Sequence, residues 1–142
     1  MRIGFVASTF DIVHPGHILM LKDAKEQCDY LIAAIQLDPS MDRQDKNKPV
    51  QSIEERQIML KAIKYIDEII VYTTEDELYA LLKIINPDIR VMGTDWKGRK
   101  YTGIDLPIEI YWHDRDVHTF STTSLRQRIW AAEENQKLSG KK

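Results

Sequence analysis

The sequence has almost no cysteine, no long apolar run and no excess of positive charge, and each shortage excludes a class of protein. Cys28 is the only cysteine among 142 residues, so no internal disulfide can form and we expect a reducing, cytoplasmic location. No basic start precedes an apolar run long enough for a bilayer, so we predict neither a signal peptide nor membrane insertion. The net charge of −2 argues against nucleic-acid binding through a basic face.

Apolar residues are plentiful enough for one folded core. They make up 43% of the chain, which predicts a single domain over residues 1–142 with "LSGKK" (138–142) as a frayed tail.

Short apolar runs alternate with segments of helical spacing. We predict strands at 2–8, 30–37, 67–73, 88–95 and 108–113, and helices at 17–28, 52–63, 75–85 and 121–137. This order indicates a Rossmann-like α/β fold, a five-stranded parallel sheet with helices on both faces.

Two histidines, His14 and His17, stand where the first predicted strand gives way to the first helix, in "STFDIVHPGHILM". The proline and glycine between them form a turn, so the N–H groups of the helix start face the edge where such sheets bind ligands. Backbone amides of Thr9 and Phe10 end the same strand. The pattern therefore predicts an anion site that carries two imidazoles.

Two other interpretations of the histidines remain open at this point. Zinc would need further ligands, and only Cys28, or His113 and His118 if the fold brought them close, could supply them. Alternatively, the two histidines only complete a turn. A long polar loop at 38–51, with no core-forming period, is a second candidate for function.

A family resemblance favours the anion site. "STFDIVHPGH" resembles the first signature of the H-x-G-H (cytidylyltransferase-like) nucleotidyltransferases, and most closely the glycerol-3-phosphate cytidylyltransferases. "DYLIAAIQLD", "SIEERQIMLKAIKYIDEII", "NPDIRVMGTDW" and "STTSLRQRI" resemble further segments in the family's order. The resemblance implies that an acceptor phosphate attacks the α-phosphate of a nucleoside triphosphate, that Mg²⁺ accompanies the triphosphate, and that pyrophosphate leaves.

The resemblance also implies site residues. Those implied to be catalytic are His14, His17 and Lys46. Those implied to bind the nucleotide and its phosphates are Thr9, Phe10, Lys48, Arg115, Ser121, Thr122 and Thr123. Those implied to bind the substrate are Asp11, Asp38, Arg56, Lys64, Asp95 and Trp96. No protein side chain is expected to bind the metal.

Several of these positions keep a plainer interpretation. Lys46 and Lys48 both fit the family's catalytic lysine, and loop reach favours Lys46. The aspartates also suit turns, Trp96 also suits a core, and Ser121 also suits a helix cap. The family tends to have arginine where Lys64 stands, and "RDVHTFSTT" is one residue longer than usual. "KGRKYTGIDLP" departs most from the family, so we expect it to determine the acceptor.

Three functions follow as alternatives. The first is a cytidylyltransferase that uses CTP and glycerol 3-phosphate or another small phosphorylated acceptor. The second is an adenylyltransferase of the heptose-1-phosphate type, whose sequences also resemble "HPGH" and "KPV" followed by "EER". The third is a non-catalytic nucleotide-binding domain. The resemblance further implies a homodimer with the "KYIDEI" region near its interface.

Overall fold

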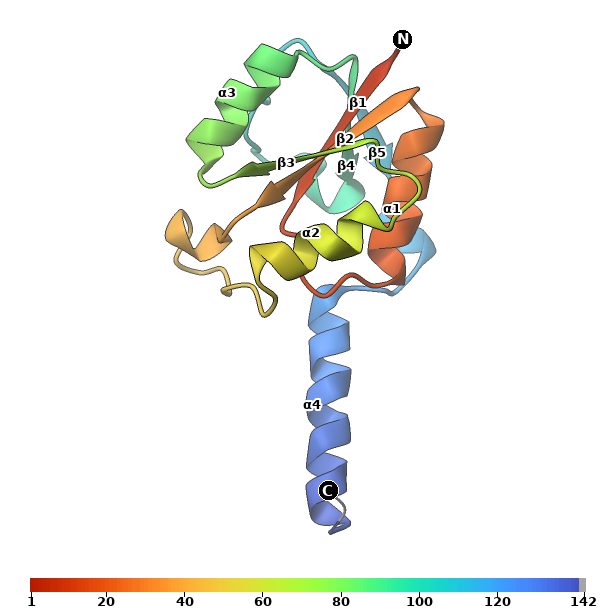
Figure 1. Cartoon of the computed structure of the whole chain (residues 1–142), viewed down its shortest axis with the longest axis vertical. Helices are drawn as coiled ribbons and strands as arrows, with labels where there is room; N and C mark the ends of the chain where they lie inside the picture. The colour runs from red at the N-terminus through yellow and green to blue at the C-terminus, as the bar shows by residue number, and fades with distance from the viewer. Residues whose placement is uncertain (141–142) are drawn as a thin grey trace.

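Five parallel strands form one sheet in the computed structural model, which describes residues 1–140 (Figure 1). Their order across the sheet is β3-β2-β1-β4-β5, and every neighbouring pair is parallel. The strands are β1 (Ile3–Ser8), β2 (Tyr30–Gln36), β3 (Glu68–Tyr72), β4 (Ile89–Gly93) and β5 (Glu109–His113). The predicted Rossmann-like sheet is confirmed. Strands β2 and β3 are added on one side of β1, and β4 and β5 on the other, so the strand order reverses between β1 and β4.

Helices cover both faces of the sheet, as predicted. The helices are α1 (Pro15–Glu26), α2 (Ile53–Lys61), α3 (Glu75–Ile85) and α4 (Thr122–Leu138). Short 3-10 helices lie at Pro39–Met41, Thr94–Trp96 and Arg115–Val117. α1 and α2 pack on one face and α3 on the other (Figure 1).

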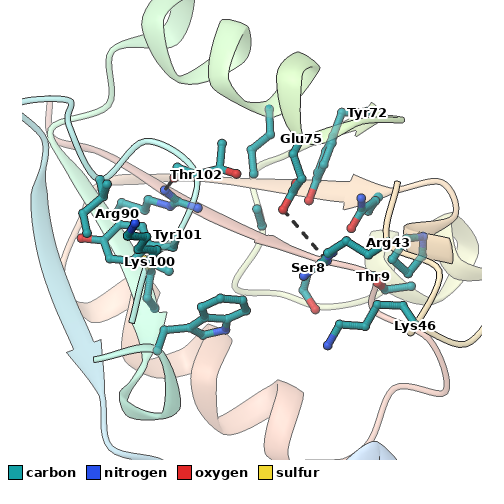
Figure 2. Close-up of a pocket in the computed structure, with 17 residues that line it drawn as sticks. Ser8, Thr9, Arg43, Lys46, Tyr72, Glu75, Arg90, Lys100, Tyr101 and Thr102 are labelled. Atoms are coloured by element: carbon teal, nitrogen blue, oxygen red, sulfur yellow. Dashed lines mark hydrogen bonds and ion pairs between the residues drawn. The ribbon is translucent and has the colours of Figure 1, made fainter. Parts of the chain in front are cut away.

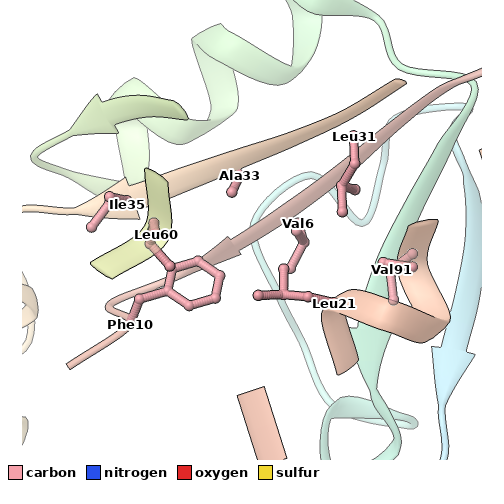
Figure 3. Close-up of a cluster of buried hydrophobic side chains, with 9 residues drawn as sticks. Val6, Phe10, Leu21, Leu31, Ala33, Ile35, Leu60 and Val91 are labelled. Carbon is pink, nitrogen blue, oxygen red and sulfur yellow. The ribbon is translucent and has the colours of Figure 1, made fainter. Parts of the chain in front are cut away.

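The two faces are filled by alternating residues of the same strands, because successive side chains of a strand point to opposite sides. Val6 of β1 and Ala33 of β2 are paired in register and face α1 and α2, where Leu21 and Leu60 pack on them (Figure 3). Phe5 belongs to the second cluster, on the side of α3. Burial on both faces explains why β2 reads as a continuous apolar run.

Local signals set the helix ends. Ser52 and Glu55 form the predicted capping box of α2, with Glu55 N–H donating to Ser52 Oγ at 3.1 Å. α3 ends at Asn86, which adopts the left-handed conformation (φ 46°). α1 begins at Pro15 rather than at His17, because His14 caps it, and Cys28 lies beyond its end.

α4 lies on neither face of the sheet and extends away from it (Figure 1). None of its residues is buried, because polar and charged side chains surround most of its length. It ends at Leu138. Of the tail expected to fray, 141–142 lie outside the described residues. No helix within residues 1–140 combines the length and apolarity that crossing a bilayer requires.

Candidate active site

The candidate site lies at the carboxyl end of β1, where a strained loop leads into α1. Phe10 and Ile12 both adopt left-handed backbone conformations, at φ 52° and 50°, which are unfavourable for side chains of this size. Asp11 between them is 7% exposed, and its two oxygens accept the N–H groups of Val50 and Gln51 at 2.9 Å each. The long loop before α2 thus holds the strained loop in place.

The side chains of His14 and His17 both accept backbone N–H groups at the start of α1. His14 Nδ1 accepts from Gly16 N–H at 3.0 Å, and His17 Nδ1 accepts from His14 N–H at 3.2 Å. The ring centroids are 4.0 Å apart. Because both Nδ1 atoms accept, the proton of each neutral ring is on Nε2. The pair therefore presents two Nε2–H donors at a helix N-terminus, where anions are favoured.

Burial keeps both rings neutral. It lowers the pKa of His17 from 6.5 to about 3, with help from His14 and Arg115 and against the opposing charge of Asp11. The pKa of His14 is lowered by burial first, then by Arg115 and His118. Neutral rings at neutral pH act here as hydrogen-bond donors without adding a net charge.

The start of α4 meets the start of α1. His14 Nε2 lies 3.2 Å from Thr122 Oγ1, and Ser121 caps α4 by accepting from Ser124 N–H at 3.0 Å, which confirms the predicted cap. A Cβ on Gly16 would lie 2.8 Å from His14 Cε1 and 3.0 Å from the Phe120 carbonyl oxygen. Only glycine fits where the start of α1 approaches the segment before α4. The N-termini of α1 and α4 therefore lie close together at one site.

Arg56 positions the strand ends beneath this site. It is 2% exposed, and it donates to the carbonyl oxygens of Thr9 at 2.9 Å, Gln36 at 2.7 Å and Leu37 at 2.6 Å. Burial lowers its pKa. Its guanidinium is thus bonded to the backbone at the ends of β1 and β2, which gives it a structural role.

A cavity of about 780 Å³ opens beside Ser8 and Thr9 (Figure 2). Its charged lining residues are Arg43, Lys46, Glu75, Arg90 and Lys100. Its aromatic ones are Tyr72, Trp96 and Tyr101. The excess of cations suits a phosphorylated ligand.

A second, smaller hollow of about 100 Å³ shares Ser8, Arg90 and Trp96 with the cavity. Asp95 and Arg115 also line it, and Arg115 Nη1 lies 3.9 Å from Asp95 Oδ1. The structure thus gathers Asp95, Trp96 and Arg115 around one recess.

The remaining predicted residues are spread more widely. Lys46 lines the cavity, but Lys48 is not among the lining residues. Asp38 caps a 3-10 helix by accepting from Ser40 N–H at 2.9 Å. Thr123 is exposed in the first turn of α4. Lys64 lies between α2 and β3, at the amino ends of the strands, so the structure does not bring it to the site.

The zinc interpretation finds no support in residues 1–140, where no group of three or more His, Cys, Asp or Glu side chains is arranged to hold a metal. His113 Nδ1 instead pairs with Asp23 at 2.9 Å. His118 stacks on Phe120, with ring centroids 5.4 Å apart.

Sequence reasoning missed Arg43 and Arg90. Arg90 is a charged residue inside the apolar run "DIRVMG" of β4, and this mismatch is the signal that could have found it. Arg43 had no such signal, because the loop around it is polar throughout.

Taken together, the parallel sheet, the two converging helix N-termini and the histidine donors define a nucleotide-binding domain of the nucleotidyltransferase class. The chain belongs to the cytidylyltransferase-like family, whose family model matches residues 5–128. It is 36% identical over 129 residues to the bifunctional protein HldE of a Nitratiruptor species, covering 90% of this chain and 28% of that protein. The HldE of Campylobacter concisus (strain 13826) is 31% identical over 137 residues, covering 96% and 29%.

The chain thus spans less than a third of these curated relatives. Among solved structures, the lipopolysaccharide core biosynthesis protein from Thermoplasma volcanium matches with a TM-score of 0.64 and 24% identity, covering 80% of this chain and 95% of that one. Pantothenate synthetase from Thermus thermophilus matches with a TM-score of 0.60 and 13% identity, covering 99% and 71%. Both likenesses concern the fold.

Proposed function

We propose that this chain transfers the nucleotidyl group of CTP to the phosphate of a small polyol or sugar phosphate. An acceptor phosphate oxygen attacks the α-phosphorus, the bond from that phosphorus to the bridging oxygen breaks, and pyrophosphate leaves with the bonding electrons. The observation that carries this proposal is the pair of neutral histidines at the start of α1, with Thr122 of α4 against His14. Such a reaction needs positioning and charge stabilisation more than a nucleophilic side chain.

Each part of the site has a place in this reaction. The Nε2–H groups of His14 and His17 donate to α-phosphate oxygens as negative charge builds. The N–H groups at the start of α4, around Thr122 and Thr123, receive the β- and γ-phosphates. Lys46 lines the cavity together with Thr9, whereas Lys48 does not. We therefore assign to Lys46 the neutralisation of negative charge between the acceptor phosphate and the triphosphate.

Mg²⁺ would enter with the triphosphate. Both carboxylate oxygens of Asp11 already accept backbone N–H groups, so this buried acid is a poor metal ligand. Mg²⁺ commonly keeps water ligands and binds substrate phosphates with few protein groups, and this donor set fits that mode. When bound, the ion would offset charge on the phosphates.

The recess formed by Asp95, Trp96 and Arg115 supports CTP, since the cytidylyltransferase resemblance implies these residues. ATP is the other candidate, because "KPVQSIEER" resembles the heptose-1-phosphate adenylyltransferases and because the similarity to the HldE proteins favours adenylyl over cytidylyl transfer. The two HldE relatives described above do not carry the name of a glycerol-3-phosphate cytidylyltransferase, so the acceptor is proposed only as a class.

Pyrophosphate release tests the proposal. CTP and ATP are each incubated with Mg²⁺ and a panel of polyol and sugar phosphates. Release with CTP alone supports the cytidylyl assignment, and release with ATP alone replaces it with adenylyl transfer. Nucleotide binding without release from any pair would favour the non-catalytic alternative.

We also expect a homodimer. The exposed apolar side chains Ile58 and Met59 of α2 and Val71 of the edge strand β3 flank the "KYIDEI" region that the resemblance implies for the interface. Sedimentation velocity of the purified chain measures this directly, and a monomer at micromolar concentration would contradict it.

A further inference from the structure

Arg90 carries a buried positive charge that forms no ion pair within residues 1–140, and the Glu75 carboxylate acts on it only from beyond 4.0 Å. It is 5% exposed, and its Nη1 donates to the carbonyl oxygen of Thr102. Its guanidinium carbon lies 5.5 Å from the Tyr101 ring centre. Within residues 1–140 no carboxylate lies within 4.0 Å of it, and its buried Nε has no hydrogen-bond partner. Buried charges are normally paired, so this arrangement points to an anion supplied by a ligand.

The other charged residues that line the cavity already have a partner or a proposed role, so Arg90 and Lys100 remain to bind that anion. Arg43 Nη2 lies 4.0 Å from Glu75 Oε1, so these two offset each other. Lys46 is assigned to the reacting phosphate. Figure 2 shows Arg43 and Lys46 on one side of the cavity, and Arg90 and Lys100 on the other.

Arg90 is also displaced from the reacting phosphate. Its register partner in β1 is Phe5, three residues before Ser8, which places it about 10 Å back along the sheet from the strand end. Phe5 packs on the α3 side of the sheet, whereas His14 and His17 stand at the start of α1, on the opposite side.

We propose, building on the function proposed above, that the acceptor carries a second anionic group, a carboxylate or a phosphate, and that Arg90 binds it with help from Lys100. The guanidinium can offer Nη2 to the anion while Nη1 holds the carbonyl of Thr102. Arginine suits recognition of both anions.

Matched acceptor pairs test this proposal. Glycerol 3-phosphate is compared with 3-phosphoglycerate, which replaces the terminal hydroxymethyl group by a carboxylate. Fructose 6-phosphate is compared with fructose 1,6-bisphosphate, which adds a phosphate. kcat/KM for pyrophosphate release is measured for wild type, Arg90→Leu and Lys100→Met. Lys97→Met is the matched control, because Lys97 is an exposed cation nearby that does not line the cavity.

In the wild type we expect the bis-anionic member of at least one pair to be preferred by about 10- to 100-fold, the usual effect of a hydrogen bond to a charged group. The pair that shows the preference identifies the second group as carboxylate or phosphate. Arg90→Leu should abolish the preference, Lys100→Met should reduce it, and Lys97→Met should keep it.

Equal use of both members by the wild type would overturn the proposal, and this comparison does not depend on whether a variant folds. A preference that survives in Arg90→Leu, or an equal loss with both members, would also overturn it. If no acceptor releases pyrophosphate, the proposed function fails separately. Calorimetric binding of the same pairs then decides the inference, and equal or undetectable binding of both members refutes it.

Discussion

His17→Asn separates the two roles of His17, as a helix cap and as a donor. The asparagine carbonyl oxygen can replace Nδ1 and accept the His14 N–H, whereas nothing replaces the Nε2–H. Loss of one transition-state donor costs about 100- to 1,000-fold in kcat. We therefore expect kcat to fall by this factor while the protein stays folded at neutral pH.

The same substitution changes how stability depends on pH. The pKa of His17 is about 3 in the folded state and 6.5 ordinarily, so below pH 6.5 the unfolded chain binds a proton that the folded chain does not. Stability due to the neutral ring is complete above pH 6.5 and is lost as the pH falls toward 3, by about 1.4 kcal/mol per pH unit. Between pH 7.5 and 4.5 the wild type should lose about 2 to 3 kcal/mol more than His17→Asn.

Urea unfolding of both proteins at the two pH values measures this difference, and groups that titrate alike in both proteins cancel. Pyrophosphate release at pH 7.5 measures kcat. An identical loss of stability in the two proteins would refute the low pKa of His17. Unchanged kcat would refute its role as a donor, whatever the stability result.

Three further substitutions test the framework of the site. Arg56→Leu leaves one buried and two partly buried carbonyl oxygens without their donor and should lower the free energy of unfolding by about 3 kcal/mol or more in urea titrations; a loss under about 1 kcal/mol would contradict its structural role. Gly16→Ala should reduce kcat at least about 10-fold, because its Cβ displaces His14, with circular dichroism confirming the fold; unchanged kcat would argue against the close approach. Ser52→Ala removes the α2 cap, which should cost about 1 kcal/mol in thermal unfolding and leave kcat unchanged. A drop in kcat there would link α2 to the chemistry.

Several features could be predicted from sequence because they depend on neighbouring residues. The apolar runs of the five strands and the alternation with helices determine the sheet, since periodicity and crossover handedness restrict the possible topologies. The caps at Ser52 and Ser121 are local in the same way. The histidine pair was found through a motif whose two members lie within one helical turn.

Other features depend on which loops meet, and the sequence does not state this. Arg56 was implied by the family resemblance to bind the substrate, and only the structure shows that it is bonded to the ends of β1 and β2. Lys46 and Lys48 both fitted the catalytic lysine, with Lys46 favoured, and the structure places Lys46 but not Lys48 in the lining of the cavity. Lys64 is positively charged like these residues, but it lies before the start of β3, at the amino ends of the strands and away from the site.

The sequence by itself therefore determined the fold and the position of the two histidines, because both follow from patterns repeated within a few residues. Only the tertiary structure decided that Arg90, hidden in an apolar strand, faces the cavity with Lys46 and Lys100, and that α4 reaches the site through Thr122 at its start and Arg126 in the next turn. The physical reason is that the partner of a charged side chain depends on segments far away in the chain, and on how deeply their packing buries it.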